Sequence, residues 1–87
     1  MEYLVTFSST HAALAAEAAC GGAGALVPVP PSVRAGCGMG LLLRVADDAA
    51  ACAQVQRFGR SAGEQGIDGL YAHEADGSYR RLEGCAP

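Results

Sequence analysis

The sequence has no tryptophan, its six basic residues are all arginine, and aromatic residues make up 6% of its 87 positions. Much of its apolar content is alanine, so large side chains are scarce and the core must be thin and closely packed. A single domain of this length buries only about 60% of the surface of its unfolded chain. The chain is therefore expected to form one small core, because it is too short for two.

A concentration of positive charge is also missing. The arginines are scattered along the chain, and the formal net charge is −3. Proteins that bind phosphate backbones need a basic stripe, so nucleic acid is not an expected partner. No apolar run approaches the ~18 residues of a membrane span, and the start MEYLVTF lacks the basic residues of a signal peptide. We expect a cytoplasmic protein with no membrane partner.

Short metal and nucleotide motifs are missing as well. The sequence contains no C-x-x-C pair, no H-E-x-x-H, no P-loop and no G-x-G-x-x-G, so we expect neither a metal site nor a cofactor. The four cysteines lie more than a dozen residues apart, at Cys20, Cys37, Cys52 and Cys85. A reducing compartment disfavours permanent disulfides. Each thiol is therefore considered separately.

Apolar periodicity and capping residues predict the secondary structure. The predicted strands are 3–7, 25–31, 39–45 and 67–73, and a turn at 76–77 leads into a short return strand. The first predicted helix is 10–20, and the second is started by Asp47 and Asp48 and ended by Gly63 and Gly66. This order predicts an α+β fold, a ferredoxin-like βαββαβ sandwich whose antiparallel sheet carries two helices on one face. Residues 1–73 form the domain, and 74–87 form a C-terminal extension with a short hairpin.

Strand alternation predicts which side chains meet the helices. Tyr3, Val5 and Phe7 are expected to face them. Leu4, Leu42 and Leu70 are then expected on the opposite face, as a patch that either forms a homodimer or is covered by the tail. In the two helices, the residues expected to face the core are Leu14, Ala15 and Ala18 in the first, and Ala51, Val55, Phe58 and Ala62 in the second.

Cys37 is the main candidate for chemistry. A cysteine is nucleophilic as its thiolate, so it needs access and a lowered pKa. Gly36 and Gly38 leave the sulfur uncrowded and allow backbone N–H groups to turn toward an anion, and Arg34 adds a cation. Alternatively, the glycines serve a tight loop and Cys37 is a small apolar plug where the strand begins.

The sequence gives weaker indications of a functional role for the other three cysteines and for His11. Cys20 and Cys52 lie among alanines in the predicted helices, where a cysteine is usually a packing residue. Cys85 is either a tail thiol able to reach another sulfur or an incidental residue of a frayed end. His11 lies in the first helical turn, where it serves as a donor to an anion, as a base, or as a solvated surface residue.

Four stretches together resemble a known family. They are YLVTFSSTHAALAAE at 3–17, VPVP at 27–30, the Cys37-Gly38 pair opening an apolar strand, and GIDGLY at 66–71. This combination resembles the DUF3343 family of small bacterial selenium/sulfur carrier-like domains. The resemblance implies that Cys37 is the characteristic cysteine and that Ser9, Thr10 and His11 match the helix-start motif. This chain has Ala35-Gly36 where the family is expected to carry Ser or Thr before the cysteine.

The resemblance implies a carrier and not an enzyme. Cys37 would hold sulfur or selenium as a persulfide or selenosulfide, received from a cysteine desulfurase or another chalcogen donor and passed to an acceptor protein. The alternative is a ligand-sensing or protein-interaction module of the ACT/ferredoxin-like type, in which Cys37 is structural. A third possibility is a thiol-redox enzyme that pairs Cys37 with Cys85.

The predicted topology also leads to an expectation about distances. We expect the loop before residue 39 to leave the sheet at the edge opposite to the start of the first helix. Cys37 and His11 would then lie far apart within one subunit. The end of the fourth strand would lie on the Cys37 edge, which makes Cys85 the better candidate for a second thiol.

Overall fold

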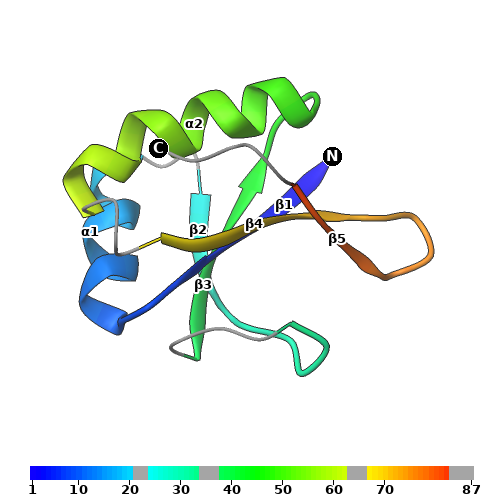
Figure 1. Cartoon of the computed structure of the whole chain (residues 1–87), viewed down its shortest axis with the longest axis horizontal. Helices are drawn as coiled ribbons and strands as arrows, with labels where there is room; N and C mark the ends of the chain where they lie inside the picture. Colours follow the sequence, from blue (N-terminus) through cyan, green and yellow to red (C-terminus); the bar gives the residue numbers. More distant parts are fainter. Residues whose placement is uncertain (21–23, 34–37, 63–66, 83–87) are drawn as a thin grey trace.

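The computed structural model describes residues 1–20, 24–33, 38–62 and 67–82, with the backbone alone for 58–62. Over these residues the strands form one antiparallel sheet in the order β2-β3-β1-β4-β5 (Figure 1). The strands are β1 (Glu2–Phe7), β2 (Gly24–Pro28), β3 (Met39–Arg44), β4 (Ile67–His73) and β5 (Tyr79–Arg81), and the helices are α1 (Thr10–Ala19) and α2 (Asp48–Ala62). The predicted α+β class, the chain order of the elements and the C-terminal hairpin are confirmed.

Each helix begins at a side chain that satisfies a free backbone N–H group. Ser9 is the N-cap of α1, and its Oγ accepts a hydrogen bond of 3.1 Å from the backbone N–H of Ala12. Asp47 has the same role before α2, where its Oδ1 accepts a bond of 2.9 Å from the N–H of Ala50. Such caps explain why both helices begin where the sequence predicts.

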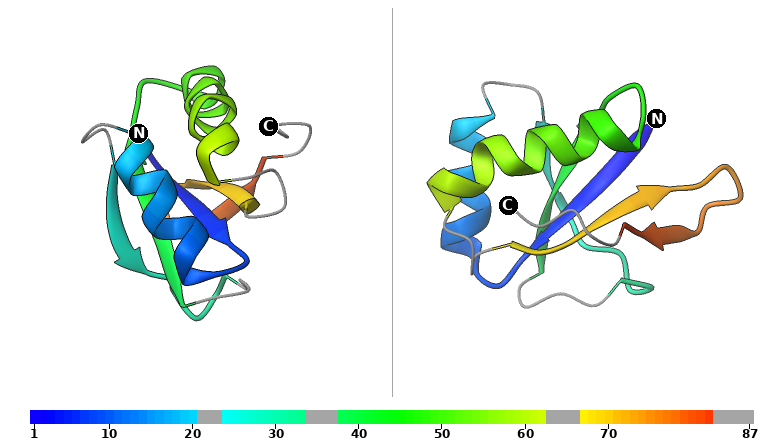
Figure 2. Two further views of the ribbon diagram at one scale, coloured as in Figure 1. Left: turned by 90° about the vertical axis from the view of Figure 1, so that its left-hand side faces the viewer. Right: turned by 45° about the horizontal axis from the view of Figure 1, so that its top comes forward.

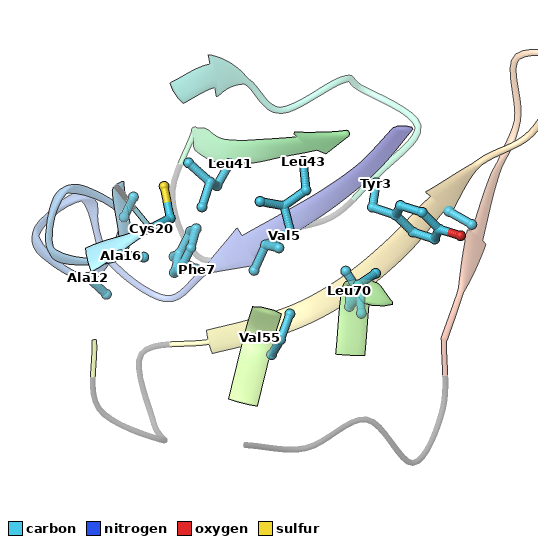
Figure 3. Packing of buried hydrophobic residues seen from close by; sticks show 13 residues of the cluster. Tyr3, Val5, Phe7, Ala12, Ala16, Cys20, Leu41, Leu43, Val55 and Leu70 are labelled. Atoms are coloured by element: carbon cyan, nitrogen blue, oxygen red, sulfur yellow. The ribbon is translucent and has the colours of Figure 1, made fainter. Parts of the chain in front are cut away.

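Both helices pack on one face of the sheet (Figure 2). Tyr3, Val5 and Phe7 of β1 are fully buried there, as predicted. Figure 3 shows Phe7 beside the alanines of α1 and Val5 near Val55 of α2, with Tyr3 at the other end of β1. Ala51 and Val55 of α2 face the core as expected, whereas the side chains of Phe58 and Ala62 lie outside the described residues.

The predicted inner face of α1 is wrong. Leu14 is 51% exposed, while Ala12, Ala13 and Ala16 are buried. Ala15 is half-buried and Ala18 is exposed. Alanine lies on every side of this helix, so the sequence lacks the periodicity that would mark one face. The small side chains let α1 approach the sheet closely, and the larger leucine is left outside.

The expected apolar patch on the opposite face does not form as predicted. Leu70 lies directly opposite Val5, so both side chains point toward the helices and Leu70 belongs to the core. Leu4 does face away from the helices, yet it is 1% exposed. Val29 packs over Gly40 beside Leu4 and covers part of this face from within the chain. Leu42 pairs with Leu4, so it also faces away from the helices, as predicted, and it is half-buried. The patch is smaller than predicted, and a homodimer stays a prediction.

Neither of the described helices combines the length and the apolar character that a membrane-spanning helix needs.

Candidate functional site

One end of the sheet brings together several residues that the sequence singles out. Thr6 lies opposite Gly40, Phe7 opposite Ile67, and Pro28 opposite Met39. The residues after β1 and the residue before β3 therefore lie at the same end. We call this the Gly38 end, and it consists of residues 7–11, 28–33, 38–39 and 67 (Figures 1 and 2).

This arrangement corrects the expected separation of the candidate residues. The start of α1, with Ser9, Thr10 and His11, lies at the same end of the sheet as Gly38, and not at the opposite edge. β1 and β3 are antiparallel neighbours, so the residues that follow β1 lie beside those that precede β3. The start of α1 and Gly38 thus lie at one end of one subunit.

The same register overturns the argument for Cys85. β4 begins at the Gly38 end, where Ile67 pairs with Phe7, and it ends at His73 on the opposite side of the sheet. The end of β4 therefore gives no reason to place Cys85 near Cys37. Arg34, Gly36, Cys37 and Cys85 themselves lie outside the described residues.

The start of α1 presents polar groups to solvent. Ser9, Thr10 and His11 are exposed. The hydroxyl of Ser9 is committed to capping, because it accepts the bond from Ala12, and the Ser9 carbonyl accepts a bond of 3.2 Å from the N–H of Ala13. The N-terminal end of a helix carries the positive end of its dipole, which favours a nearby anion. The Gly38 end is therefore favourable to negative charge.

Gly38 itself is exposed. Its carbonyl accepts a hydrogen bond of 2.9 Å from the N–H of Val29, which extends the β2–β3 ladder by one residue. Among the described residues, no atom lies within 4 Å of the place where a Cβ at Gly38 would be.

The described cysteines are not candidates for an exposed nucleophile. Cys20 is 4% exposed, and its Sγ donates a hydrogen bond of 3.1 Å to the carbonyl of Glu17, so its predicted packing role is confirmed. Cys52 packs against the core, as expected, but its sulfur also takes part in a disulfide, which the sequence did not predict. Neither residue belongs to the Gly38 end.

Ion pairs gather at the opposite end of the sheet. Glu2 binds Arg44 at 3.1 Å between Oε2 and Nε, and its Oε1 lies 3.4 Å from Nδ1 of His73. These contacts lower the pKa of Glu2, with His73 the larger cause. His73 also stacks on Tyr79, with ring centroids 4.6 Å apart. His73 is thus half-buried in a network of contacts.

Tyr3 and Asp48 form a second network at this opposite end. The buried Tyr3 hydroxyl donates a hydrogen bond of 2.7 Å to Oδ1 of Asp48, and Arg80 approaches Oδ2 of Asp48 at 3.2 Å. Burial and the Asp48 carboxylate raise the pKa of Tyr3 to about 12. The Tyr3 bond and Arg80 lower the pKa of Asp48. The network joins β1, α2 and β5, and its role is structural.

By contrast, the segments 7–11, 28–33 and 38–39 contain no Asp, Glu or Arg. An anion at the Gly38 end is therefore not repelled by carboxylates of these segments. Within the described part of the chain, no three His, Cys, Asp or Glu side chains gather into a group able to hold a metal ion.

Comparison with known proteins adds a family. A family model described as “Putative Se/S carrier protein-like” matches residues 2–67, which confirms the resemblance seen in the sequence. The matched region runs from β1 to the start of β4, so it includes Ser9, Thr10, His11, Cys37 and Gly38 and excludes Cys85. Searches of curated proteins and of solved structures find no match.

Proposed function

The chain belongs to the “Putative Se/S carrier protein-like” family, and from that membership we propose that it carries sulfur or selenium on Cys37. The carrier is not an enzyme and uses no cofactor. It receives its cargo from a cysteine desulfurase or another chalcogen donor and passes it to an acceptor protein. The family match carries this proposal. The register between β1 and β3 supports the site, because it brings the α1 N-terminus to the strand end that follows Cys37.

The transfer step needs no oxidant. The Cys37 thiolate attacks the outer sulfur of a donor persulfide, a new S–S bond forms on Cys37, and the donor's own S–S bond breaks. The donor leaves as a thiolate, which takes up the proton of the persulfide. The same exchange in reverse delivers the sulfur to the acceptor. A selenium atom in the outer position follows the same steps through a selenosulfide.

The surroundings support an ionised thiol in this role. A cysteine near a helix N-terminus has a lowered pKa, because the helix dipole favours the thiolate. The bound persulfide is also an anion, and the segments of the Gly38 end contribute no carboxylate against it. Arg34, three residues before Cys37, is proposed as an additional cation, and Gly36 and Gly38 as residues that keep the sulfur accessible.

The distribution of arginines makes the test simple. Cleavage after arginine puts each cysteine in a separate peptide: 1–34 holds Cys20, 35–44 holds Cys37, 45–57 holds Cys52 and 82–87 holds Cys85. The full chain is first treated with a reductant that opens the Cys52 disulfide, and the reductant is removed. The chain is then incubated with a cysteine desulfurase and L-cysteine, its thiols and persulfides are trapped by alkylation, and the peptides are weighed. We expect peptide 35–44 to gain one sulfur atom, and Cys37→Ser to abolish the gain. Loading confined to another peptide would contradict the proposal.

A further inference from the structure

The hairpin that joins β4 to β5 turns at an exposed aspartate–glycine pair, Asp76-Gly77. The N–H of Gly77 donates a hydrogen bond of 3.0 Å to the carbonyl of Glu74, and the N–H of Glu74 donates one of 2.8 Å to the carbonyl of Ser78. Gly77 has a φ of 90°, a conformation that other residues rarely adopt. The shape of the turn therefore requires a glycine directly after Asp76.

An aspartate followed by glycine rearranges without an enzyme or an oxidant. The glycine nitrogen attacks Cγ of the neutral carboxyl group, a C–N bond forms, and the carboxyl OH leaves as water with the amide proton. Glycine favours this attack because it has no Cβ to crowd the nitrogen. Water then opens the five-membered ring at either carbonyl and yields aspartate or isoaspartate. In isoaspartate the main chain runs through the side chain and is one carbon atom longer.

Both reacting groups are engaged in this turn. The nitrogen of Gly77 is held by its bond to the Glu74 carbonyl. Oδ1 of Asp76 accepts a hydrogen bond of 2.6 Å from the Ser78 hydroxyl and one of 2.9 Å from the Ser78 N–H. These two bonds lower the pKa of Asp76, so the neutral carboxyl group that reacts is scarcer than in an unfolded chain. The folded turn thus opposes the rearrangement at both reacting atoms.

We propose that Asp76 is a site of spontaneous isoaspartate formation that the folded turn holds in check, and that the modification releases β5. A main chain that is longer by one atom changes the spacing between Glu74 and Ser78, whose hydrogen bond closes the hairpin. The hairpin lies beyond residues 2–67, which the family model matches, so the site is independent of the carrier chemistry.

The position of β5 depends on the closed hairpin. Tyr79 stacks on His73 across the hairpin, with ring centroids 4.6 Å apart. Arg80 reaches from β5 to α2, where its Nη2 lies 3.2 Å from Oδ2 of Asp48. Both contacts require the register that the turn sets between β4 and β5. A lengthened turn is therefore expected to weaken them together.

The chain contains its own comparison site. Asp68-Gly69 is a second aspartate–glycine pair, and it lies near the start of β4, at the opposite end of this strand from the hairpin. Cleavage after arginine leaves both pairs in peptide 61–80. A second protease that cuts before aspartate but not before isoaspartate then shows which position has rearranged. Each digest thus reports on both sites.

The experiment ages the full chain for several weeks at neutral pH, folded in buffer and unfolded in guanidinium chloride. Ser78→Ala removes the hydroxyl that binds Asp76 and keeps the backbone N–H. Ser32→Ala is the matched control, because Ser32 is an exposed serine at the Gly38 end. Urea unfolding is recorded for both variants. If Ser78→Ala does not fold, the comparison of folded with unfolded wild type decides alone.

We expect isoaspartate at Asp76 to form about tenfold or more slowly in the folded wild type than in the unfolded chain. Ser78→Ala should raise the folded rate at Asp76 by about threefold or more and leave the rate at Asp68 unchanged. Ser32→Ala should change neither rate. Equal rates in the folded and unfolded chains, or no acceleration in a folded Ser78→Ala variant, would overturn the proposal.

Release of β5 has its own measurement. The aged chain with isoaspartate at position 76 is isolated by chromatography, and amide hydrogen exchange is followed by NMR. The N–H of Leu82 donates a bond of 2.9 Å to the Leu70 carbonyl, and the N–H of Val29 donates one of 2.9 Å to the Gly38 carbonyl at the other end of the sheet. Exchange at Leu82 should rise by about threefold or more, with Val29 unchanged. Unchanged exchange at Leu82 would refute the release.

Discussion

Thr6 of β1 and Gly40 of β3 lie directly opposite each other, next to the Gly38 end of the sheet. Because these strands are antiparallel, the chain that leaves β1 and the chain that enters β3 share one end of the sheet. This pairing brings the exposed first turn of α1 to the side where Gly38 follows Cys37. The carrier proposal depends on that shared end.

The first prediction tests the electrostatic influence of α1 on Cys37. Thr10→Glu places a carboxylate at the Gly38 end, in a first helical turn where it does not destabilise the helix. We expect alkylation of Cys37 at neutral pH to slow by about two- to fivefold. Ala18→Glu is the matched control, because the same charge then lies ~12 Å farther along α1. Equal effects of the two variants, or none, would refute the role of α1.

The second prediction concerns the packing between β1 and β3. Gly40→Ala introduces a Cβ that would lie 2.8 Å from Leu4 and 2.9 Å from a backbone oxygen, so β1 or β3 must shift. We expect the free energy of unfolding to fall by about 1–3 kcal/mol. Gly38→Ala should leave it nearly unchanged. Urea unfolding of both variants checks this, and equal stabilities would contradict the distinction drawn between the two glycines.

The third prediction tests the observed orientation of α1. Leu14 is 51% exposed, so Leu14→Gln should change the free energy of unfolding by less than ~0.5 kcal/mol. Ala16 is fully buried against the sheet, and Ala16→Leu should destabilise the protein by about 1–3 kcal/mol. The opposite ranking in urea unfolding would mean that the helix packs through the leucine.

The fourth prediction concerns the pH dependence of stability. The pKa of Tyr3 is raised to about 12 from its ordinary value near 10, so this contribution to stability is present below pH 10 and is lost as the pH rises toward 12. The pKa of Asp48 is lowered, so its contribution is present above its ordinary value of 3.8 and is lost as the pH falls below it. Unfolding is expected to become easier at both extremes.

Tyr3→Phe separates these effects. It removes the hydroxyl that donates to Asp48 at 2.7 Å, and we expect a loss of about 1 kcal/mol at neutral pH. Much of the alkaline loss of stability should disappear, because phenylalanine does not titrate. Urea unfolding across the pH range provides the measurement. An alkaline limb identical to that of the wild type would show that Tyr3 is not its source.

The sequence predicts the elements of this fold well, because caps and apolar runs are local signals. Ser9 and Asp47 mark where the helices begin, and the alternation of Tyr3, Val5 and Phe7 marks the inner face of β1. The sequence does not show which side of α1 packs against the sheet, because alanines surround Leu14 on all sides. Leu70 was assigned to the wrong face, because pairing with Val5 depends on the register between β4 and β1.

The candidate site is only partly accessible to sequence reasoning. Cys37 and Gly38 stand out through their residue types and the family motif. Whether they lie at the same end of the sheet as His11 depends on the directions in which the strands run. β2 must run parallel to β1 because both are antiparallel to β3, so the β2–β3 connection leaves at the end where α1 begins. The crowding around Gly40 by Leu4 and Val5 becomes visible only in the three-dimensional structure.

The central claim is that Cys37 is ionised and reachable at neutral pH. The measurement that tests it most directly is the rate of iodoacetamide alkylation of peptide 35–44 in the folded full-length chain as a function of pH. The account predicts a pKa well below the ~8.5 of a free cysteine and a faster reaction at neutral pH than in the urea-unfolded chain. A pKa at or above that value, with a reaction no faster than in the unfolded chain, would contradict it and favour a structural cysteine.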